Sequence, residues 1–196
     1  MSFLHDRPGA IAVAVATLMA LSTAPANADP AADPLGPACA DYAGGGQAGA
    51  GSVPDAAQQP LTVAASRNPQ LSALSAALSG KLNPAVNLVD TLNAGQFTVV
   101  APVDNAFSRL PPEATASLQT DAARLTRLLT YHVIPGQFSP TNLDGAHKTL
   151  QGGELTVTGS PNHLWINDAL VLCGGITTAN ATLYLIDTVL TPPPGS

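Results

Sequence analysis

The stretch FTVVAPVDNAFSRLP, at residues 97–111, constrains the fold of this chain more than any other segment. It opens with aromatic and β-branched side chains that favour a strand, and Pro102 then removes a backbone donor, so the strand is expected to end at about Ala101. Asp104 fits the N-cap of a short helix carrying Phe107, because its carboxylate can accept backbone N–H groups. A strand, a proline break, a capped helix and an inward Phe107 predict a sharp corner where a sheet meets helices.

Helical patterns lie on both sides of this corner. Leucines three and four residues apart predict a helix over residues 68–80, which is led by Asn-Pro and ended by a glycine. A second Asn-Pro signal predicts another helix over 83–94. The clearest helical pattern covers 121–131, where Asp121 stands at the positive end of the helix and leucines form an apolar stripe.

The C-terminal part of the sequence has the pattern of strands. Apolar residues and threonines alternate over 155–158, and two short apolar runs at 164–166 and 169–172 flank Asn-Asp, a hairpin-type turn. Residues 183–190 are almost continuously apolar apart from Asp187, as expected of a strand that is covered on both faces. Helices early in the chain and strands late in it, around one early strand, indicate an α+β fold.

Three segments are expected along the chain. Residues 1–28 have the features of a secretory signal peptide, with Arg7 before an uncharged apolar run and a small-x-small pattern that predicts cleavage after Ala28 and a secreted, extracellular protein. Residues 29–57 are rich in Ala, Gly and Pro and predict a flexible extension. Their G-x-G-x-x-G match has no strand before it, so we interpret it as a linker. The folded domain is expected over 58–194.

Charge and composition exclude several partners. The net charge is −6, charged residues make up 10% of the chain and aromatic residues 4%. The core is therefore expected to be aliphatic. An acidic chain without basic clusters argues against nucleic acid and anionic lipid surfaces as partners. The sequence has no second long apolar run after the N-terminal one, so the mature chain is expected to have no membrane span. It is also expected to be a monomer.

The two cysteines, Cys39 and Cys173, allow two interpretations. In an exported chain with no other cysteine they favour a disulfide, which would hold the N-terminal extension to the late strand region. The other interpretation is a pair of free buried thiols. Acylation of Cys39 fits the sequence less well, because the preceding Gly-Pro-Ala does not resemble a lipobox.

Residues with catalytic or metal-binding chemistry are few. None of the histidines has H-E-x-x-H spacing, and the chain has neither a G-x-S-x-G elbow nor a G-x-x-x-x-G-K phosphate loop. No catalytic, cofactor or metal site is therefore predicted. His132 follows Tyr131 among apolar residues and is expected to be buried with a hydrogen-bond partner, for which Asp104 and Asp187 are the candidates. A structural role for this histidine is favoured over a catalytic one.

Three stretches of the sequence together resemble the motifs of fasciclin (FAS1) domains. FTVVAPVDNAF is similar to the first conserved motif, TYHVIPGQ to the Tyr-His motif and ANATLYLIDTVLTPP to the second motif, in the same order and spacing. The cysteines, the signal peptide and the segment NPAVNLVDTLNAGQ are most similar to the secreted immunogenic fasciclin-domain antigens of mycobacteria. The resemblance implies a small β-wedge with helices folded around it. The motif residues expected to have structural roles are Asp104, Phe107, Tyr131, His132 and Asp187.

The resemblance also implies cell-adhesion or matrix-binding activity without an established reaction. In animal members the Tyr-His region is associated with integrin binding, which makes Tyr131 and His132 candidate adhesion residues here. An extracellular carrier of a lipid or small apolar ligand is an alternative, and a hydrolase is a third. Contacts with a protein or cell-surface partner are expected from loops at 139–148 and 160–163, because loops can vary without disturbing the core.

Overall fold

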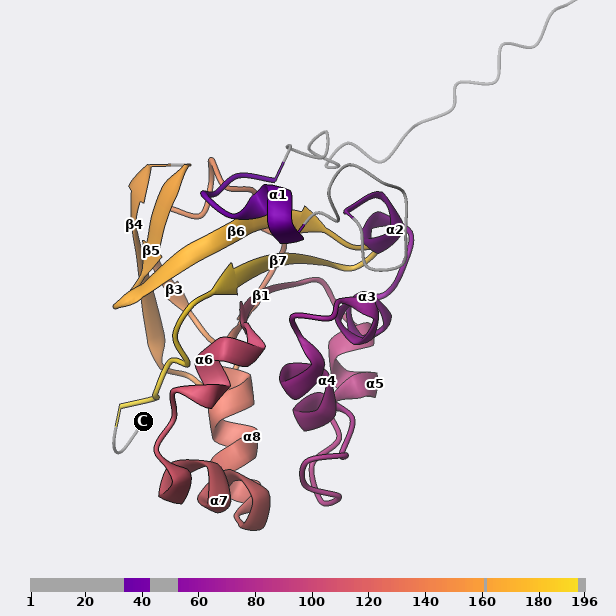
Figure 1. Ribbon diagram of the computed structural model, residues 1–196. Coiled ribbons are helices and arrows are strands. Elements are labelled where there is room, and N and C mark those ends of the chain that lie inside the picture. Colours follow the sequence, from indigo (N-terminus) through magenta and orange to yellow (C-terminus); the bar gives the residue numbers. More distant parts are fainter. Residues whose placement is uncertain (1–33, 43–52, 161, 194–196) are drawn as a thin grey trace, which may run out of the picture.

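The computed structural model describes residues 34–42, 53–160 and 162–193, which form a seven-stranded sheet with helices packed against it (Figure 1). The helices are α1 (Cys39–Tyr42), α2 (Val53–Ala57), α3 (Leu61–Arg67), α4 (Ser72–Leu78), α5 (Val89–Asn93), α6 (Asp104–Ser108), α7 (Pro112–Thr120) and α8 (Ala122–Tyr131). The strands are β1 (Phe97–Pro102), β2 (Val133–Pro135), β3 (Gly145–Lys148), β4 (Glu154–Ser160), β5 (His163–Ile166), β6 (Ala169–Thr177) and β7 (Ala181–Ile186). The α+β prediction is confirmed.

The strands follow the order β2-β1-β7-β6-β5-β4-β3 across the sheet. β1 and β7 run parallel, with Phe97 opposite Ala181, and the other paired strands are antiparallel. The sheet also curls until its two ends meet. Just after β3, Leu150 donates its backbone N–H to the carbonyl oxygen of Val133 in β2 at 2.8 Å. The result is a nearly closed wedge.

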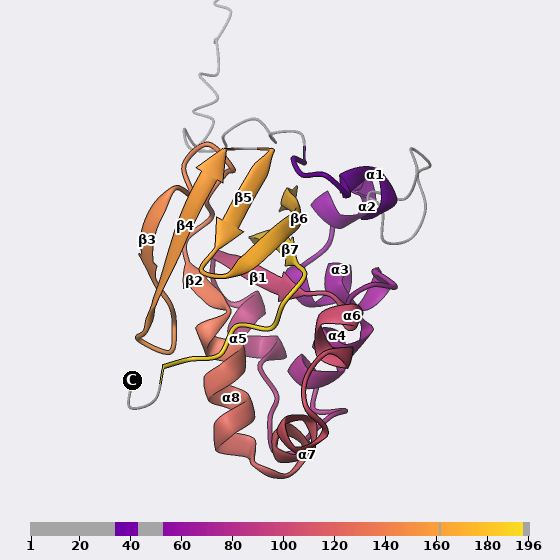
Figure 2. The same cartoon turned by 60° about the vertical axis from the view of Figure 1, so that its left-hand side comes forward.

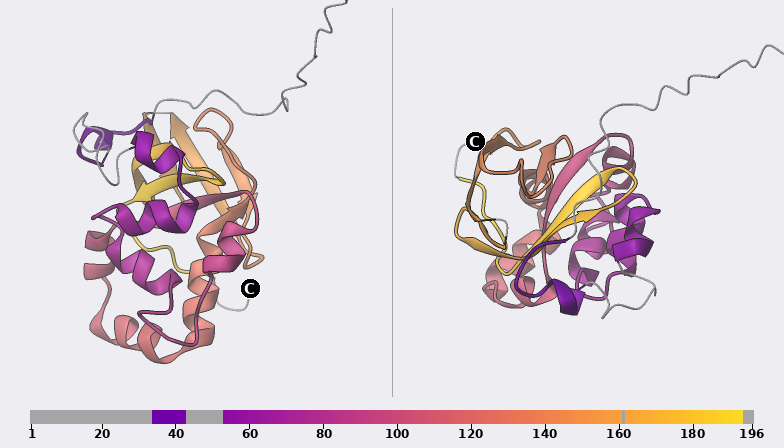
Figure 3. Two further views of the ribbon diagram at one scale, coloured as in Figure 1. Left: turned by 90° about the vertical axis from the view of Figure 1, so that its right-hand side faces the viewer. Right: turned by 90° about the horizontal axis from the view of Figure 1, so that it is seen from above.

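Two hydrophobic cores lie on opposite faces of β1, β7 and β6, which we call the inner strands. In the view from above, β7 runs between the early helices and the later strands (Figure 3). The core on the helix side includes Leu61, Leu74, Leu125, Leu183 and Leu185. The core inside the wedge includes Leu155, Ile166, Val171, Tyr184 and Ile186. The inner strands are therefore covered on both faces.

The sequence of β7 alternates between the two cores. Leu183 and Leu185 belong to the helix-side core, whereas Tyr184 and Ile186 belong to the wedge core, and all four are buried. This confirms the predicted strand with two covered faces, although the strand ends at Ile186 and does not continue to residue 190. In a sheet with one face in water, every second residue of a strand is polar. β7 has a core on each face, so both sets of alternate residues are mainly apolar.

Strands β3, β4 and β5, which we call the outer strands, extend away from the helical layer and have one open face (Figure 2). In β4 the residues Leu155 and Val157 are buried, and the residues that alternate with them are exposed. The predicted hairpin joins β5 to β6, and Asn167 adopts a positive φ of 51°, as turn asparagines often do. β4 thus shows the inward-outward alternation expected from residues 155–158, β5 shows it too, and β3 is largely exposed.

The helix predictions were correct in part. α8 confirms the helix over 121–131, and the carboxylate of Asp121 accepts the backbone N–H of Arg124 at 2.9 Å. Over 68–80 the helix is shorter and begins only at Ser72. The side chain of Asn68 accepts the N–H of Gln70 at 2.9 Å and so forms a turn before that helix begins.

The predicted helix over 83–94 was wrong in extent, because only α5 forms there. Asn83 and Asn87 accept the backbone N–H groups of Ala85 and Val89 at 3.1 and 3.0 Å. These local turns compete with helical hydrogen bonds and delay the helix. Helices α3 and α7 were not predicted. α7 begins at Pro112, where a proline is tolerated because the first helical N–H groups have no intrahelical partner.

The predicted disulfide between Cys39 and Cys173 is present, with an S–S distance of 2.04 Å. It is one of several contacts that hold residues 34–42 against β6. Leu35 and Gly174 exchange backbone hydrogen bonds of 2.9 and 2.8 Å beside the disulfide. Helix α2 also packs on the domain through the buried Ala56. The described parts of 29–57 are therefore packed, whereas the signal peptide and the G-x-G-x-x-G stretch lie outside the described residues.

Candidate functional site

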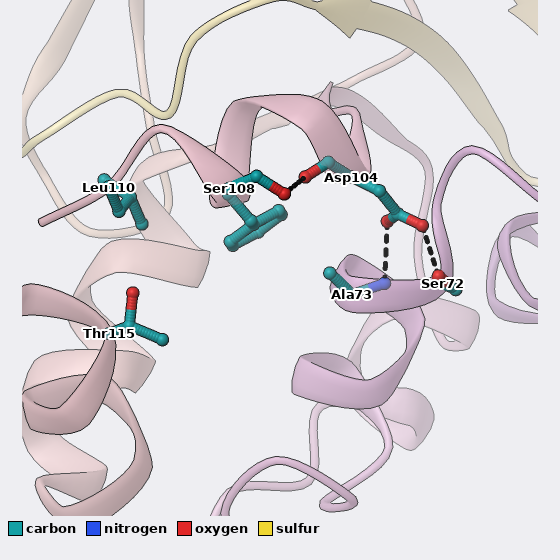
Figure 4. A pocket seen from close by; sticks show the side chains of 7 residues that line it. Ser72, Ala73, Asp104, Ser108, Leu110 and Thr115 are labelled. Carbon is teal, nitrogen blue, oxygen red and sulfur yellow. Dashed lines mark hydrogen bonds between the residues drawn. The ribbon is translucent and has the colours of Figure 1, made fainter. Parts of the chain in front are cut away.

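The residue at the centre of the corner, Asp104, caps a different helix from the one predicted. Its carboxylate accepts the backbone N–H of Ala73 at 2.8 Å and is hydrogen-bonded to the hydroxyl of Ser72, at the start of α4 (Figure 4). Its own helix, α6, has Val103 as N-cap and no side-chain cap. The N-cap prediction for α6 is therefore wrong, because the carboxylate reaches the unsatisfied N–H groups of a neighbouring helix.

The hollow around Asp104 offers little chemistry. It is an open pocket of about 550 Å³ that Ser108, Leu110 and Thr115 also line (Figure 4). Phe107 lines it as well and packs its half-buried ring against the helix-side core. No histidine, lysine or cysteine lines the hollow. The carboxylate of Asp104 is already hydrogen-bonded to the start of α4. We therefore interpret this pocket as a gap between packed helices and not as a ligand site.

His132 is buried, with 1% of its surface exposed, and links the end of α8 to the C-terminal segment. Its Nδ1 lies 2.8 Å from the carbonyl oxygen of Leu128, and its Nε2 accepts the backbone N–H of Leu190 at 3.1 Å. The Nδ1 therefore carries the proton. Burial lowers the pKa of His132 from 6.5 to about 4, opposed by its hydrogen bond to Leu128.

The predicted acidic partners of His132 were wrong. Neither Asp104 nor Asp187 bonds to the ring, because two backbone groups already satisfy both nitrogens. Asp187 instead holds the start of β6, where its carboxylate accepts the N–H of Leu170 at 3.0 Å and its own N–H donates to the Leu170 carbonyl. Its other carboxylate oxygen lies 3.9 Å from the guanidinium of Arg109.

The tyrosines of the motifs are buried in the wedge. Tyr131 is 3% exposed; its hydroxyl donates to the carbonyl oxygen of Glu154 at 3.1 Å and accepts from the side-chain amide of Asn167 at 3.3 Å. Burial also raises the pKa of Tyr184, whose hydroxyl donates to the carbonyl oxygen of Phe138 at 2.9 Å. With His132 buried as well, the two predicted adhesion residues present almost no surface to a partner.

Asn180, in the turn just before β7, connects three segments of the domain. Its side-chain oxygen accepts the N–H of Leu61 at the start of α3 at 2.9 Å. Its side-chain nitrogen donates to the carbonyl oxygens of Leu92 and Gly95 at 2.7 and 3.0 Å. That nitrogen is the atom that N-glycosylation would modify, and here it is fully used. Its place in the motif just before β7 was the only sequence signal for this role.

The polar residues of the three motifs share one property. Asp104, His132, Asn180 and Asp187 direct their side chains at backbone groups of distant segments. Such side chains fix the arrangement of helices and strands. In the described part of the chain, no three His, Cys, Asp or Glu side chains come together in a way that could hold a metal ion.

A second pocket, of about 330 Å³, lies where α7, α8 and the C-terminal segment meet. Leu110, Leu118 and Leu128 supply apolar surface to it, and Arg124 and Arg127 line it from α8. No motif in the sequence had predicted a pocket at this place. A carrier of an apolar ligand would need a pocket of this kind, although this one is at the small end of the range of about 300–1,000 Å³ for ligand sites.

The open face of the outer strands carries the only tryptophan of the chain. Trp165 is 39% exposed and stands opposite Thr158 in β4 and Leu170 in β6. The ring of His163 meets it edge-on, with ring centroids 6.3 Å apart. Ser160 is the cross-strand neighbour of His163. An aromatic ring with polar neighbours is thus displayed on a firmly paired sheet.

A family model for the fasciclin domain matches residues 69–192, which is more than half of the chain. The chain therefore belongs to the fasciclin domain family, and the fold described above is the FAS1 fold. Within the described residues, no helix has the length and apolar character needed to cross a bilayer.

Two mycobacterial proteins are close relatives. The cell surface glycolipoprotein MPB83 of Mycobacterium bovis is 57% identical over 171 residues, which are 87% of this chain and 78% of the relative. The immunogenic protein MPB70 of the same species is 53% identical over 184 residues, which are 94% of this chain and 95% of the relative. The resemblance to mycobacterial fasciclin-domain antigens is confirmed.

A solved structure supports the fold. The FAS1 domain pair of the insect cell adhesion molecule Fasciclin I matches with a TM-score of 0.59 at 16% identity, over 69% of this chain and 52% of that chain. This chain thus spans about half of that structure. At this identity the match establishes the shared fold alone.

Proposed function

We propose that this chain is a secreted, non-enzymatic binding module that recognises a component of a host or cell-envelope surface. The relatives support the location, since one is named a cell surface glycolipoprotein and the other an immunogenic protein. The disulfide supports it too, because such bonds persist in oxidising compartments outside the cytosol. N-terminal sequencing of the secreted protein should begin at Asp29. A secreted form that still carries residues 1–28 would contradict the predicted signal peptide.

One observation carries the proposal: the polar motif side chains are already hydrogen-bonded within the fold, whereas the open face of the outer strands is exposed to solvent. The polar motif side chains are bonded to backbone and leave little to lower a reaction barrier. The outer strands display Trp165 beside His163 on a surface of paired strands. Tryptophan is enriched among the residues that dominate binding energy at protein interfaces. We therefore place the contact surface on this face.

The proposed face includes residues from only one of the two loops that the sequence suggested as contact regions. In the 139–148 segment, Pro140 and Leu143 are buried, and the ring of His147 packs 4.7 Å from that of Phe138. The second half of that segment is strand β3, which is paired with β4 in the sheet. Ser160 and His163, from the second suggested loop, border the open face directly. The proposed surface therefore keeps the second loop and adds Trp165.

A matched pair of exposed hydrophobic residues tests the proposal. Leu150 and Trp165 are both 39% exposed, but Leu150 lies outside the proposed face, after β3. Binding of the secreted protein to host cells and to isolated envelope should fall at least tenfold with Trp165→Ala and stay unchanged with Leu150→Ala. Equal thermal unfolding of both variants would show that folding is not responsible.

Two outcomes would overturn the proposal. Equal loss of binding in both variants would mean that general hydrophobicity drives the signal. Turnover of an ester or glycan library by the purified protein, abolished by a single His or Asp substitution in a variant that still folds, would show an enzyme instead.

A further inference from the structure

The second pocket, bounded by α7, α8 and residues 191–193, combines apolar surface with positive charge. Leu118 and Leu128 are buried residues that line it, and Leu110 is half-buried. Arg124 and Arg127 line the same pocket and are exposed. They are three residues apart on one helix, so they project from the same side of α8.

Within the described ranges of the chain, the guanidinium groups of Arg124 and Arg127 form no ion pair or side-chain hydrogen bond. The ion pairs found among the described residues are Arg67 with Asp55 and Arg109 with Asp187. The acidic residue in the pocket lining is Asp121, and its carboxylate accepts the backbone N–H of Arg124 as the N-cap of α8. Both guanidinium groups can therefore meet a ligand. In a chain of net charge −6, this pair is a local positive site.

We infer that this pocket binds a single-chain fatty acid, with the acyl chain against the leucines and the carboxylate on Arg124 and Arg127. A guanidinium group matches the planar geometry of a carboxylate through two parallel hydrogen bonds. The apolar surface excludes a purely polar anion as the preferred ligand, because burying the acyl chain supplies the larger part of the binding energy. The volume of about 330 Å³ suits one chain better than a lipid with two.

The site is separate from the open face of the outer strands. Its residues come from α7, α8 and the C-terminal segment, whereas Trp165 lies in β5. The acid-binding site and the partner-binding face can therefore be tested independently. Loss of one activity with retention of the other identifies which proposal fails.

Binding should be measured by NMR amide shifts of the secreted chain during titration with dodecanoate, dodecanol and acetate. Dodecanoate should shift the amides of Leu118, Ala123 and Leu128 and bind at least tenfold more tightly than dodecanol. Acetate should not bind at the same concentrations. These three probes separate the contribution of the charge from that of the chain.

Two variants locate the charge contribution. Arg124→Gln with Arg127→Gln keeps good helix formers and should abolish the preference for dodecanoate over dodecanol. Lys81→Gln with Lys148→Gln removes the same charge from exposed positions outside the pocket and should leave that preference intact. Filling the pocket with Ala114→Phe should weaken both long-chain ligands.

The inference is overturned by any of three results. Dodecanol could bind as tightly as dodecanoate, the arginine double variant could keep the preference, or the shifted amides could lie around Trp165. Absence of amide shifts with dodecanoate would equally exclude the site. The arginines are exposed, so their replacement should leave the fold intact, and the amide spectrum of the unliganded variant checks this directly.

Discussion

The inner and outer strands of one sheet use their residues in different ways. The inner strands β1, β7 and β6 separate two cores, and all six residues of β7 are buried. The outer strands β4 and β5 alternate buried and exposed residues and keep one open face. The polar motif residues cluster around the inner strands, where each one holds backbone groups.

The residues that stabilise the fold and the residues proposed to contact a partner therefore lie in different regions of the sheet. Side chains such as Asn180 that tie distant elements together cannot change without leaving buried backbone groups unsatisfied. On the open face, Trp165 can change with little effect on packing, since a large part of its surface already meets solvent. The motif residues therefore hold the fold together, and under the proposed function the open face is the region that meets the partner.

The largest expected effect comes from the disulfide that holds the N-terminal segment to β6. Replacing Cys39 and Cys173 together by alanine removes a cross-link between residues 134 positions apart, so the free energy of unfolding should fall by up to about 5 kcal/mol. Denaturant unfolding measures this loss. Hydrogen exchange should quicken at Leu35 and Gly174 and change less in β4. An unchanged unfolding midpoint would show that the disulfide does not stabilise the inner strands.

The next effect is the pH dependence caused by His132. Its pKa is about 4 in the folded chain and 6.5 as a reference, so the unfolded chain binds the proton more readily between these values. Above pH 6.5 the neutral His132 therefore costs the folded state nothing. As the pH falls from 6.5 towards 4, the free energy of unfolding drops by about 3 kcal/mol because the unfolded chain takes up the proton first.

Comparison with a variant isolates this histidine. His132→Ala should lower stability at pH 7 by about 1–3 kcal/mol, because it leaves the Leu128 carbonyl and the Leu190 N–H without partners. Its unfolding free energy should also vary less between pH 6.5 and 4 than that of the parent chain. Identical pH profiles for the two proteins would assign the titration to other groups.

A third effect compares two asparagines. Asn180→Ala removes three hydrogen bonds to α3, the end of α5 and the segment after it, and should lower the free energy of unfolding by about 2 kcal/mol. Asn142→Ala, at an exposed position, should change it by less than about 0.5 kcal/mol. Urea unfolding of both variants gives the comparison. Equal small effects would show that the Asn180 link contributes little.

The smallest expected effect on stability is on the open face. Trp165→Ala should lower the free energy of unfolding by less than about 1 kcal/mol, because the indole is already 39% exposed. Thermal unfolding measures this value on the same sample used for cell binding. A loss of several kcal/mol would mean that the outer strands depend on Trp165 for packing, and the contrast between the two regions would disappear.

The sequence by itself determined the elements whose signals are local. Alternation predicted β4, and the leucine stripe with Asp121 predicted α8. The nearly unbroken apolar run predicted that β7 is covered on both faces. The pairing of Cys39 with Cys173 followed from the predicted export and from the lack of any other cysteine. Each of these signals depends on side-chain type and spacing alone, which the sequence states directly.

Only the tertiary structure decided what the polar motif residues bind. Asp104 caps a helix 31 positions away, His132 bonds to a backbone group 58 positions away, and Asn180 reaches one 119 positions away. Their partners are main-chain N–H and carbonyl groups, which every residue but proline offers in the same form. The sequence therefore does not identify these partners. The packing of the two cores selects them by bringing distant segments together.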